Sequence, residues 1–190
     1  MNSSKYVQKL KPQKPTPPTI GGRYKIVAAL GKGGFGQTFL AHDLHLPGAP
    51  QCVVKQLKPR RHDQRSLASA RRLFDAEARA LHDLGHHPQI PYLLAHFEEQ
   101  EQFFLVQEFI EGNLLSQELS GESPMPEDQV VELLQEILTT LAFVHECQIV
   151  HRDIKPSNLI RRKQDQKIVL IDFGTVKQIN APLDPNEDSF

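Results

Sequence analysis

The most constraining feature of this 190-residue sequence is the run His151-Arg152-Asp153-Ile154-Lys155-Pro156-Ser157-Asn158, followed fourteen residues later by Asp172-Phe173-Gly174. Two short segments between these runs, Leu159–Arg161 and Lys167–Ile171, predict a hairpin bracketed by turns. Two aspartates, a lysine and an asparagine then lie close together. Phosphoryl transfer uses such a set: one carboxylate orients the attacking hydroxyl, an ammonium steadies the phosphoryl group, and an amide and a second carboxylate hold the metal. The alternative, a polar turn without chemistry, is disfavoured by two matches at this spacing.

Composition narrows the class of protein. With 39% hydrophobic and 24% charged residues, the chain resembles a soluble globular protein. Its net charge of −1 gives no indication of binding to nucleic acid or to an anionic membrane. The apolar runs are only a few residues long, so we expect no membrane-spanning helix and no secretory signal. Two cysteines 95 residues apart, Cys52 and Cys147, favour a reducing cytoplasm.

Residues 1–20 are expected to form a disordered tail. The segment Lys11-Pro12-Gln13-Lys14-Pro15-Thr16-Pro17-Pro18 is stiff and extended and offers nothing apolar to bury. Its P-x-x-P spacing would also suit a ligand of a proline-binding domain, although a plain leader is the simpler interpretation.

A glycine-rich segment follows the first predicted strand, Tyr24–Leu30. Its sequence, Gly31-Lys32-Gly33-Gly34-Phe35-Gly36, has the pattern G-x-G-x-x-G, which dinucleotide-binding folds also use. In those folds a helix begins at the last glycine, whereas here Thr38–Ala41 continues as strand and Lys55 comes nineteen residues after Gly36. This favours a β-turn-β flap whose backbone N–H groups close over phosphates. A dinucleotide-dependent oxidoreductase is therefore disfavoured.

Lys55 lies in the predicted strand Gln51–Leu57, where alternation places it between two apolar residues of one face. Such a lysine is poorly solvated and needs an anionic partner. The helix predicted from Ser66 to Leu84 offers Glu77 in the middle of its apolar stripe. We therefore predict a Lys55–Glu77 ion pair; the alternative is a solvated glutamate on a basic helix.

The next elements are a hairpin, Leu93–Glu99 with Gln102–Glu108, and a short helix, Leu114–Leu119. A longer helix is predicted from Glu127 to His145, with a proline and two acidic residues at its start. Its apolar stripe comprises Val130, Leu134, Ile137, Leu141 and Val144.

Together these motifs resemble the eukaryotic-type serine/threonine protein kinases, and within them the bacterial members, over residues 24–177. The resemblance implies an α+β, protein-kinase-like fold. A complete small lobe, a five-stranded antiparallel sheet plus helix C, would span residues 21–108. The hinge and the first part of a helical large lobe would span 109–180, before an acidic tail at 181–190. ATP and Mg²⁺ are the implied cofactors, and a protein Ser/Thr hydroxyl is the implied acceptor.

The resemblance also assigns roles. Asp153 would be the base or orienting carboxylate, Lys155 would contact the γ-phosphate, and Asn158 and Asp172 would hold Mg²⁺. The residues implied for nucleotide binding are Gly31, Lys32, Gly33, Gly34, Phe35, Gly36, Thr38, Val53, Lys55, Glu77, Gln107, Glu108, Ile110 and Ile160. In this set Gln107 would guard the back of the adenine pocket, and the main chain of Glu108 and Ile110 would contact the base. The stacked residues that align the lobes would be Leu81, Leu93, His151 and Phe173.

Three departures from the family pattern stand out. Thr38 replaces a usual valine, and Val53 replaces a usual alanine, which narrows the adenine pocket without forbidding ATP. The sequence also ends at Phe190, before an A-P-E motif and the remaining helices of the large lobe. The stripe of the long helix would then lack partners, favouring aggregation or an outside partner. Arg152 would have no activation loop to hold.

Two interpretations remain open from the sequence. The first is a serine/threonine protein kinase, because every residue of the transfer chemistry is present and Lys155 favours Ser/Thr over Tyr acceptors. The second is a nucleotide-binding or partner-binding fragment that has lost catalysis together with half of its large lobe.

Overall fold

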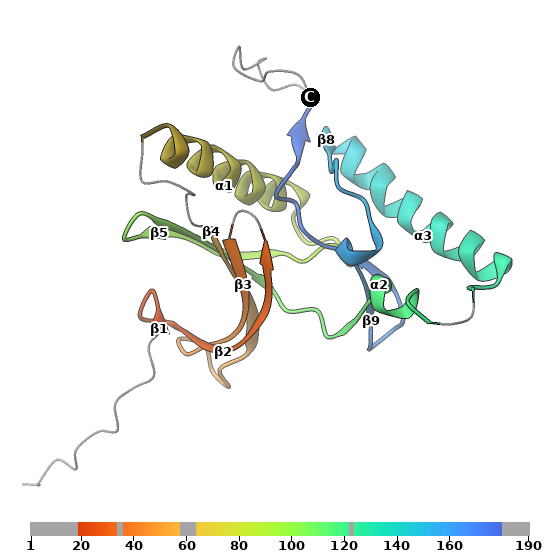
Figure 1. Cartoon of the computed structure of the whole chain (residues 1–190), viewed down its shortest axis with the longest axis horizontal. Helices are drawn as coiled ribbons and strands as arrows, with labels where there is room; N and C mark the ends of the chain where they lie inside the picture. The colour runs from red at the N-terminus through yellow and green to blue at the C-terminus, as the bar shows by residue number, and fades with distance from the viewer. Residues whose placement is uncertain (1–18, 34–35, 58–63, 122–123, 180–190) are drawn as a thin grey trace, which may run out of the picture.

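The computed structural model describes residues 19–33, 36–57, 64–121 and 124–179. A curled antiparallel sheet with helix α1 forms one side of the molecule, and α2, α3 and β9 lie on the other (Figure 1). This arrangement confirms a kinase-like fold with a small lobe and part of a helical large lobe. No helix in the described ranges is both long enough and apolar enough to cross a membrane.

The sheet has the strand order β1-β2-β3-β4-β6-β5, and all its pairings are antiparallel. The strands are β1 (Thr19–Ile20), β2 (Tyr24–Gly33), β3 (Gly36–Asp43), β4 (Gln51–Leu57), β5 (Leu93–Glu99) and β6 (Gln102–Glu108).

Five of these strands were predicted, and the sixth, β1, corrects the prediction that the tail extends to residue 20. Gly21 and Gly22, both at positive φ, turn the chain so that Thr19 and Ile20 pair with Lys25 and Tyr24. The remainder of the predicted tail, residues 1–18, lies outside the described residues.

Helix α1 (Gln64–Leu84) covers one face of this sheet. Its buried residues Phe74 and Leu81 share a core with Phe103 and Leu105 of β6. The residues that alternate with these on β6 point to the opposite face, as the two-residue period of a strand requires. They belong to a second core that comprises Tyr24, Ala41, Cys52, Val54, Phe104 and Val106.

The other half of the molecule is built from shorter elements. They are β7 (Gly112–Leu114), α2 (Leu115–Glu118), α3 (Glu127–Glu146), β8 (Ile149–Val150), a 3₁₀ turn (Pro156–Asn158), β9 (Leu159–Arg162), β10 (Ile168–Leu170) and β11 (Lys177–Gln178). The predicted hairpin is confirmed as β9 paired with β10, and β7 extends it to three strands. A separate pair, β8 with β11, joins residues on either side of this hairpin.

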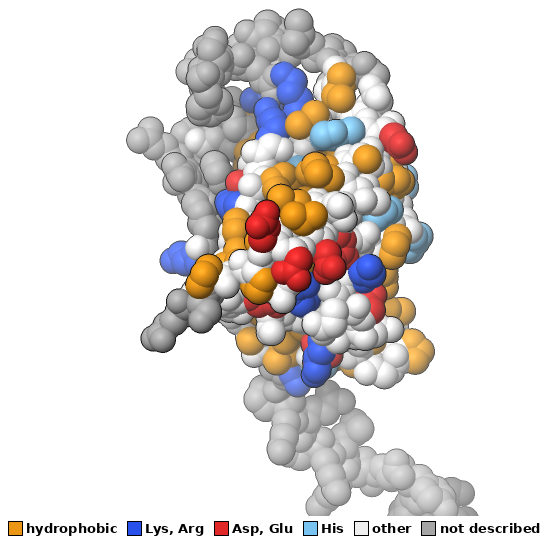
Figure 2. Space-filling model, turned by 90° about the vertical axis from the view of Figure 1, so that its right-hand side faces the viewer, with side chains coloured by type: hydrophobic (Ala, Val, Ile, Leu, Met, Phe, Trp, Pro, Cys, Tyr) orange, Lys and Arg blue, Asp and Glu red, His pale blue; other side chains and the backbone are white. Residues whose placement is uncertain are grey.

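The apolar stripe of α3 is only partly covered. Ile137 and Val144 are buried, whereas Leu134 is 52% exposed. On neighbouring turns, Val131 is 47% exposed and Leu138 is 61% exposed. Figure 2 shows hydrophobic side chains gathered on this side of the molecule, with acidic side chains beside them. The expectation that the stripe lacks partners is therefore confirmed for one edge of the helix and wrong for the other, which packs into the core.

Candidate active site

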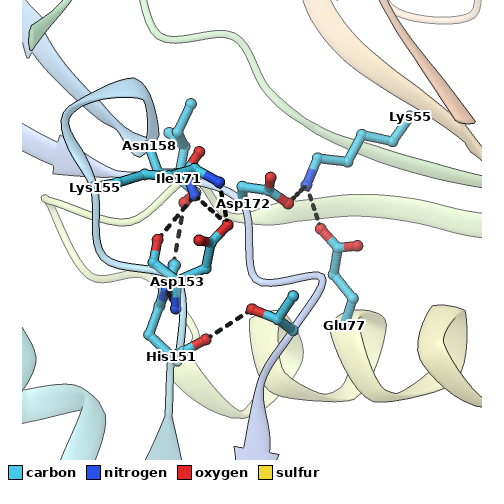
Figure 3. Close-up of polar contacts among 9 residues, drawn as sticks. Lys55, Glu77, His151, Asp153, Lys155, Asn158, Ile171 and Asp172 are labelled. Carbon is cyan, nitrogen blue, oxygen red and sulfur yellow. Dashed lines mark hydrogen bonds and ion pairs between the residues drawn. The ribbon is translucent and has the colours of Figure 1, made fainter. Parts of the chain in front are cut away.

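Lys55 of β4 is the centre of a three-residue charge cluster. Its Nζ contacts Oε1 of Glu77 on α1 and lies 2.9 Å from Oδ1 of Asp172 (Figure 3). The Lys55 side chain is 13% exposed and that of Glu77 is 3% exposed. The predicted Lys55–Glu77 pair is thus confirmed. The contact with Asp172 was not predicted, because no local pattern joins residues 117 positions apart.

The electrostatics of the cluster favour the charged forms of Lys55 and Asp172. Burial alone would lower the pKa of Lys55, but the carboxylates of Glu77 and Asp172 outweigh burial, so its pKa is raised. Burial likewise favours a raised pKa for Asp172, yet the charge and hydrogen bond of Lys55 reverse this and its pKa is lowered. One cation therefore sits between two carboxylates, which leaves the cluster with excess negative charge facing the second group of residues.

That second group comes from the loop after β8. The carboxylate Oδ2 of Asp153 accepts hydrogen bonds from Lys155 Nζ at 2.7 Å and from Asn158 Nδ2 at 3.0 Å. Asn158 Nδ2 also donates to the backbone oxygen of Asp153 at 2.9 Å. These bonds use the amide nitrogen of Asn158, so its side-chain oxygen remains as an acceptor. In Figure 3, Asp172 lies between this group and Lys55.

Backbone bonds hold the two groups at a fixed separation. Ile171 N donates to Asn158 O at 2.9 Å, which ties the residue before Asp172 to the 3₁₀ turn. His151, only 1% exposed, accepts from the Asp153 amide through Nδ1, so its Nε2–H donates to Ile171 O at 3.2 Å. Burial lowers the pKa of His151, which keeps the ring neutral at pH 7. The imidazole ring also packs edge-on against the ring of Phe173, with 4.7 Å between the two ring centroids.

The four residues expected to stack between the lobes are brought together. Leu81 and Phe173 belong to one core cluster, Leu93 packs against it, and His151 contacts Phe173. This core therefore links α1, β5 and the loops that carry Asp153 and Asp172.

Arg152 contacts the backbone directly after Gly174, which the sequence did not predict. Arg152 Nε donates to the carbonyl of Thr175 at 2.6 Å and its Nη2 to that of Val176 at 3.2 Å. In return Thr175 Oγ1 donates to His151 O at 3.0 Å, a contact that no sequence signal indicated. Arg152 thus fixes the first residues after Gly174, because their carbonyls lie within reach of its guanidinium.

The glycine-rich flap is described only in part. Residues Gly31 to Gly33 end β2 and Gly36 begins β3, while Gly34 and Phe35 lie outside the described residues. A Cβ on Gly36 would lie 2.0 Å from the backbone oxygen of Gln56, so only glycine permits this close approach of β3 to β4.

The residues expected around adenine lie on neighbouring strands. Thr38 on β3 pairs with Lys55 on β4, and Val53, also on β4, pairs with Gln107 on β6. Val53 and Gln107 are buried, as is Ile110 just beyond β6. Ile160 belongs to the other sheet, on β9, where it pairs with Leu114 of β7.

The donor set is compatible with Mg²⁺. Mg²⁺ prefers oxygen ligands and is held in nucleotide sites by one or two carboxylates together with substrate phosphates and waters. Asp172 supplies a carboxylate and Asn158 an amide oxygen, both beside the loop of Asp153. Within the described residues no group of three or more His, Cys, Asp or Glu side chains could hold a metal ion.

Comparison with known proteins agrees with the geometry. A family model described as protein kinase domain matches residues 24–188. Serine/threonine-protein kinase B of a Synechocystis species is 51% identical over 168 residues, which cover 88% of this chain and 29% of that protein. Serine/threonine-protein kinase C of the same organism is 48% identical over a match that covers 86% of this chain and 31% of that protein. Serine/threonine-protein kinase PknA of a Nostoc species is 43% identical, covering 84% and 28%. The chain therefore spans about three tenths of the length of these relatives.

Proposed function

Since the chain belongs to the protein kinase family, we propose that it provides the MgATP site of a serine/threonine protein kinase and transfers the γ-phosphate to a protein hydroxyl. The observation that carries this proposal is the bridge from Lys55 to Glu77 and Asp172, set beside the hydrogen-bonded group of Asp153, Lys155 and Asn158. A purely structural buried lysine needs one carboxylate, whereas this one organises two, of which Asp172 is also a potential metal ligand.

Each residue has a chemical task in this proposal. Lys55, held by Glu77, binds the α- and β-phosphates, and Asp172 and Asn158 hold Mg²⁺. The bound metal supplies neutralisation of the charge on the β- and γ-phosphates. Asp153 receives or orients the hydroxyl proton of the acceptor, and Lys155, 2.7 Å from that carboxylate, meets the transferred phosphoryl group.

The nucleotide base has a proposed place as well. The flap of residues 31–36 covers the phosphates with backbone N–H groups, and Thr38 and Val53 form the roof over adenine. Gln107 closes the back of this pocket, Glu108 and Ile110 contact the base through their main chain, and Ile160 forms part of its floor. Tyr92 O already accepts the amide hydrogen of Glu108, at 3.1 Å, which directs the proposed contact to the Glu108 carbonyl.

Two further proposals concern the setting of the site. Both cysteines are free thiols, which supports a reducing, cytoplasmic environment. The exposed edge of α3, formed by Val131, Leu134 and Leu138, calls for a covering partner or a further part of the polypeptide.

That exposed edge also favours the second candidate function, a nucleotide-binding or partner-binding unit without transfer activity. The two functions differ in one observable. A kinase transfers phosphate to Ser or Thr and depends on Asp153, whereas a binding unit responds to MgATP without transferring it.

Transfer from γ-labelled ATP to a general protein substrate, followed by phosphoamino-acid analysis, tests the proposal. We expect label on Ser or Thr but not Tyr, and a decrease of about 10²- to 10⁴-fold in Asp153→Asn. Asp165→Asn, in the exposed β9–β10 turn, is the matched control and should keep the wild-type rate. Equal labelling in wild type and Asp153→Asn would refute the proposed mechanism, and binding of MgATP without any transfer would select the second candidate.

A further inference from the structure

The outer edge of β10 is covered by two residues that have no role in the proposed transfer chemistry. One edge of this strand pairs with β9. On the other edge, Leu170 N donates to the backbone oxygen of Gln89 at 2.9 Å, and Gln89 Nε2 donates to Ile168 O at 3.0 Å. Gln89, in the linker after α1, thus replaces a neighbouring strand.

Glu136 of α3 completes this edge. Its Oε1 accepts hydrogen bonds from Ile168 N and from Gln89 Nε2, both at 2.9 Å. Ile168 is 2% exposed, so its N–H has no ready access to water. Charged acceptors form stronger hydrogen bonds than neutral ones, and a buried donor that loses its partner is costly. We name Gln89 and Glu136 the edge clamp of β10.

The edge clamp closes a ring of contacts that passes through the charge cluster. Glu77 and Gln89 are joined by the end of α1 and its linker, and Gln89 is bonded to β10. Asp172 follows β10 by two residues and returns to Glu77 through Lys55. Asp172 is therefore held both by its direct bond to Lys55 and, through β10, by the edge clamp.

We propose that Gln89 and Glu136 are positioning residues that hold Asp172 against Lys55 and thereby set the affinity of the site for Mg²⁺. This inference rests on the proposed function, because it concerns the same metal–nucleotide site. Neither residue touches Lys55, Asp172, Asp153 or Asn158 through any contact described above, so their effect on the site passes through β10.

The expected effect is specific to the metal. Without the clamp, β10 and Asp172 can move away from Lys55, so a metal ligand is misplaced while the adenine pocket between β3, β4 and β6 is unchanged. We expect Glu136→Ala and Gln89→Ala to raise the Mg²⁺ concentration for half-maximal stabilisation by ATP about tenfold, the effect of losing one to two hydrogen bonds. The affinity for ATP at saturating Mg²⁺ should change much less.

Matched variants separate positioning from folding. Glu132→Ala, on the exposed surface one turn earlier in α3, is the control for removal of a helix carboxylate. Glu136→Gln keeps an acceptor oxygen for Ile168 N and should retain most of the wild-type Mg²⁺ response. If an alanine variant fails to fold, the corresponding variant Glu136→Asp or Gln89→Asn is used in its place, because it shortens the side chain by only one methylene.

The experiment is a Mg²⁺ titration of thermal stability at fixed ATP for the full chain, with hydrogen exchange of residues 171–174 without nucleotide. A tenfold increase in Glu136→Ala but not in Glu132→Ala supports the inference, and equal titrations in all variants overturn it. If even the wild type ignores MgATP, the proposed function fails and exchange decides about positioning. Faster exchange at 171–174 in Glu136→Ala than in Glu132→Ala then supports the clamp, and equal exchange overturns it.

Discussion

The buried Lys55–Glu77 pair offers a quantitative test of how the site is held together. Lys55→Met removes the cation between two carboxylates, of which that of Glu77 is 3% exposed and cannot turn to water. Breaking a buried pair on one side costs about 3–5 kcal/mol of unfolding free energy. Glu77→Leu should cost about 3 kcal/mol, at the lower end of this range, because Lys55 keeps Asp172 as a partner at 2.9 Å.

The double variant Lys55→Met/Glu77→Leu should be much less destabilised than the sum of the single changes. It replaces the pair with apolar side chains of similar volume, which is often nearly neutral, and Asp172 at 46% exposure can be solvated. With single losses of about 3 kcal/mol or more each and a double variant near neutral, we expect a coupling free energy of about 5 kcal/mol or more between Lys55 and Glu77. The ion pair of Arg71 and Glu98, whose side chains are 53% and 38% exposed, is the internal reference. Its coupling free energy should be less than about 1 kcal/mol.

Urea unfolding of the four proteins in each cycle measures both couplings. The chain has no tryptophan, so far-ultraviolet circular dichroism is the appropriate signal, with linear extrapolation to zero urea. Additive effects at Lys55 and Glu77, or a coupling no larger than that of Arg71 and Glu98, would refute the argument that burial makes this pair strong.

Three further predictions concern the surrounding fold. The hydrogen bond from Arg23 lowers the pKa of buried Asp43. The stability that ionised Asp43 contributes is therefore complete above about pH 4 and is lost as pH falls through the lowered pKa. Arg23→Gln should weaken this pH dependence of the unfolding free energy in urea melts from pH 7 to 3. Gly112→Ala should cost about 1–3 kcal/mol, because the new Cβ would lie 2.2 Å from a backbone oxygen of β9. Leu138→Lys should leave the unfolding free energy within about 0.5 kcal/mol and reduce light scattering.

Each of these predictions has a control or a contradicting outcome. An unchanged pH dependence in Arg23→Gln would show that the ion pair does not set the acid stability of Asp43. Gly121→Ala is the control for Gly112→Ala, because its nearest atom would be 3.7 Å away, and equal losses of stability would contradict the steric argument. Undiminished light scattering in Leu138→Lys would mean that the exposed edge of α3 does not drive association.

The sequence predicts those parts of the site that follow from local periodicity and spacing. Alternation in β4 placed Lys55 on an apolar face, and the helical stripe placed Glu77 on the facing side of α1, so their pairing could be inferred. The hairpin β9–β10 likewise followed from turn residues around two short strands. In both cases the signal lies in residues that are close together in the sequence.

Other features depend on tertiary contacts that leave no periodic signal. Glu136 has the sequence context of an ordinary polar position on a helix, and only the uncovered edge of β10 gives it a role. Thr19 and Ile20 follow a proline-rich segment, so their pairing with β2 was hidden by their neighbours. The contact of Lys55 with Asp172 likewise requires that the small lobe and the hairpin be placed together.

The most direct test of a metal–nucleotide site is a thermal melt of the chain with and without MgATP, beside Asp172→Ala. A ligand that binds only the folded state stabilises it by about 2.7 kcal/mol at a hundredfold excess over its dissociation constant. For a chain of this size we expect the midpoint to rise by about 5–10 °C in the wild type and not in Asp172→Ala. A cooperative melt that MgATP leaves unchanged, or an equal rise in Asp172→Ala, would contradict the assignment of this site.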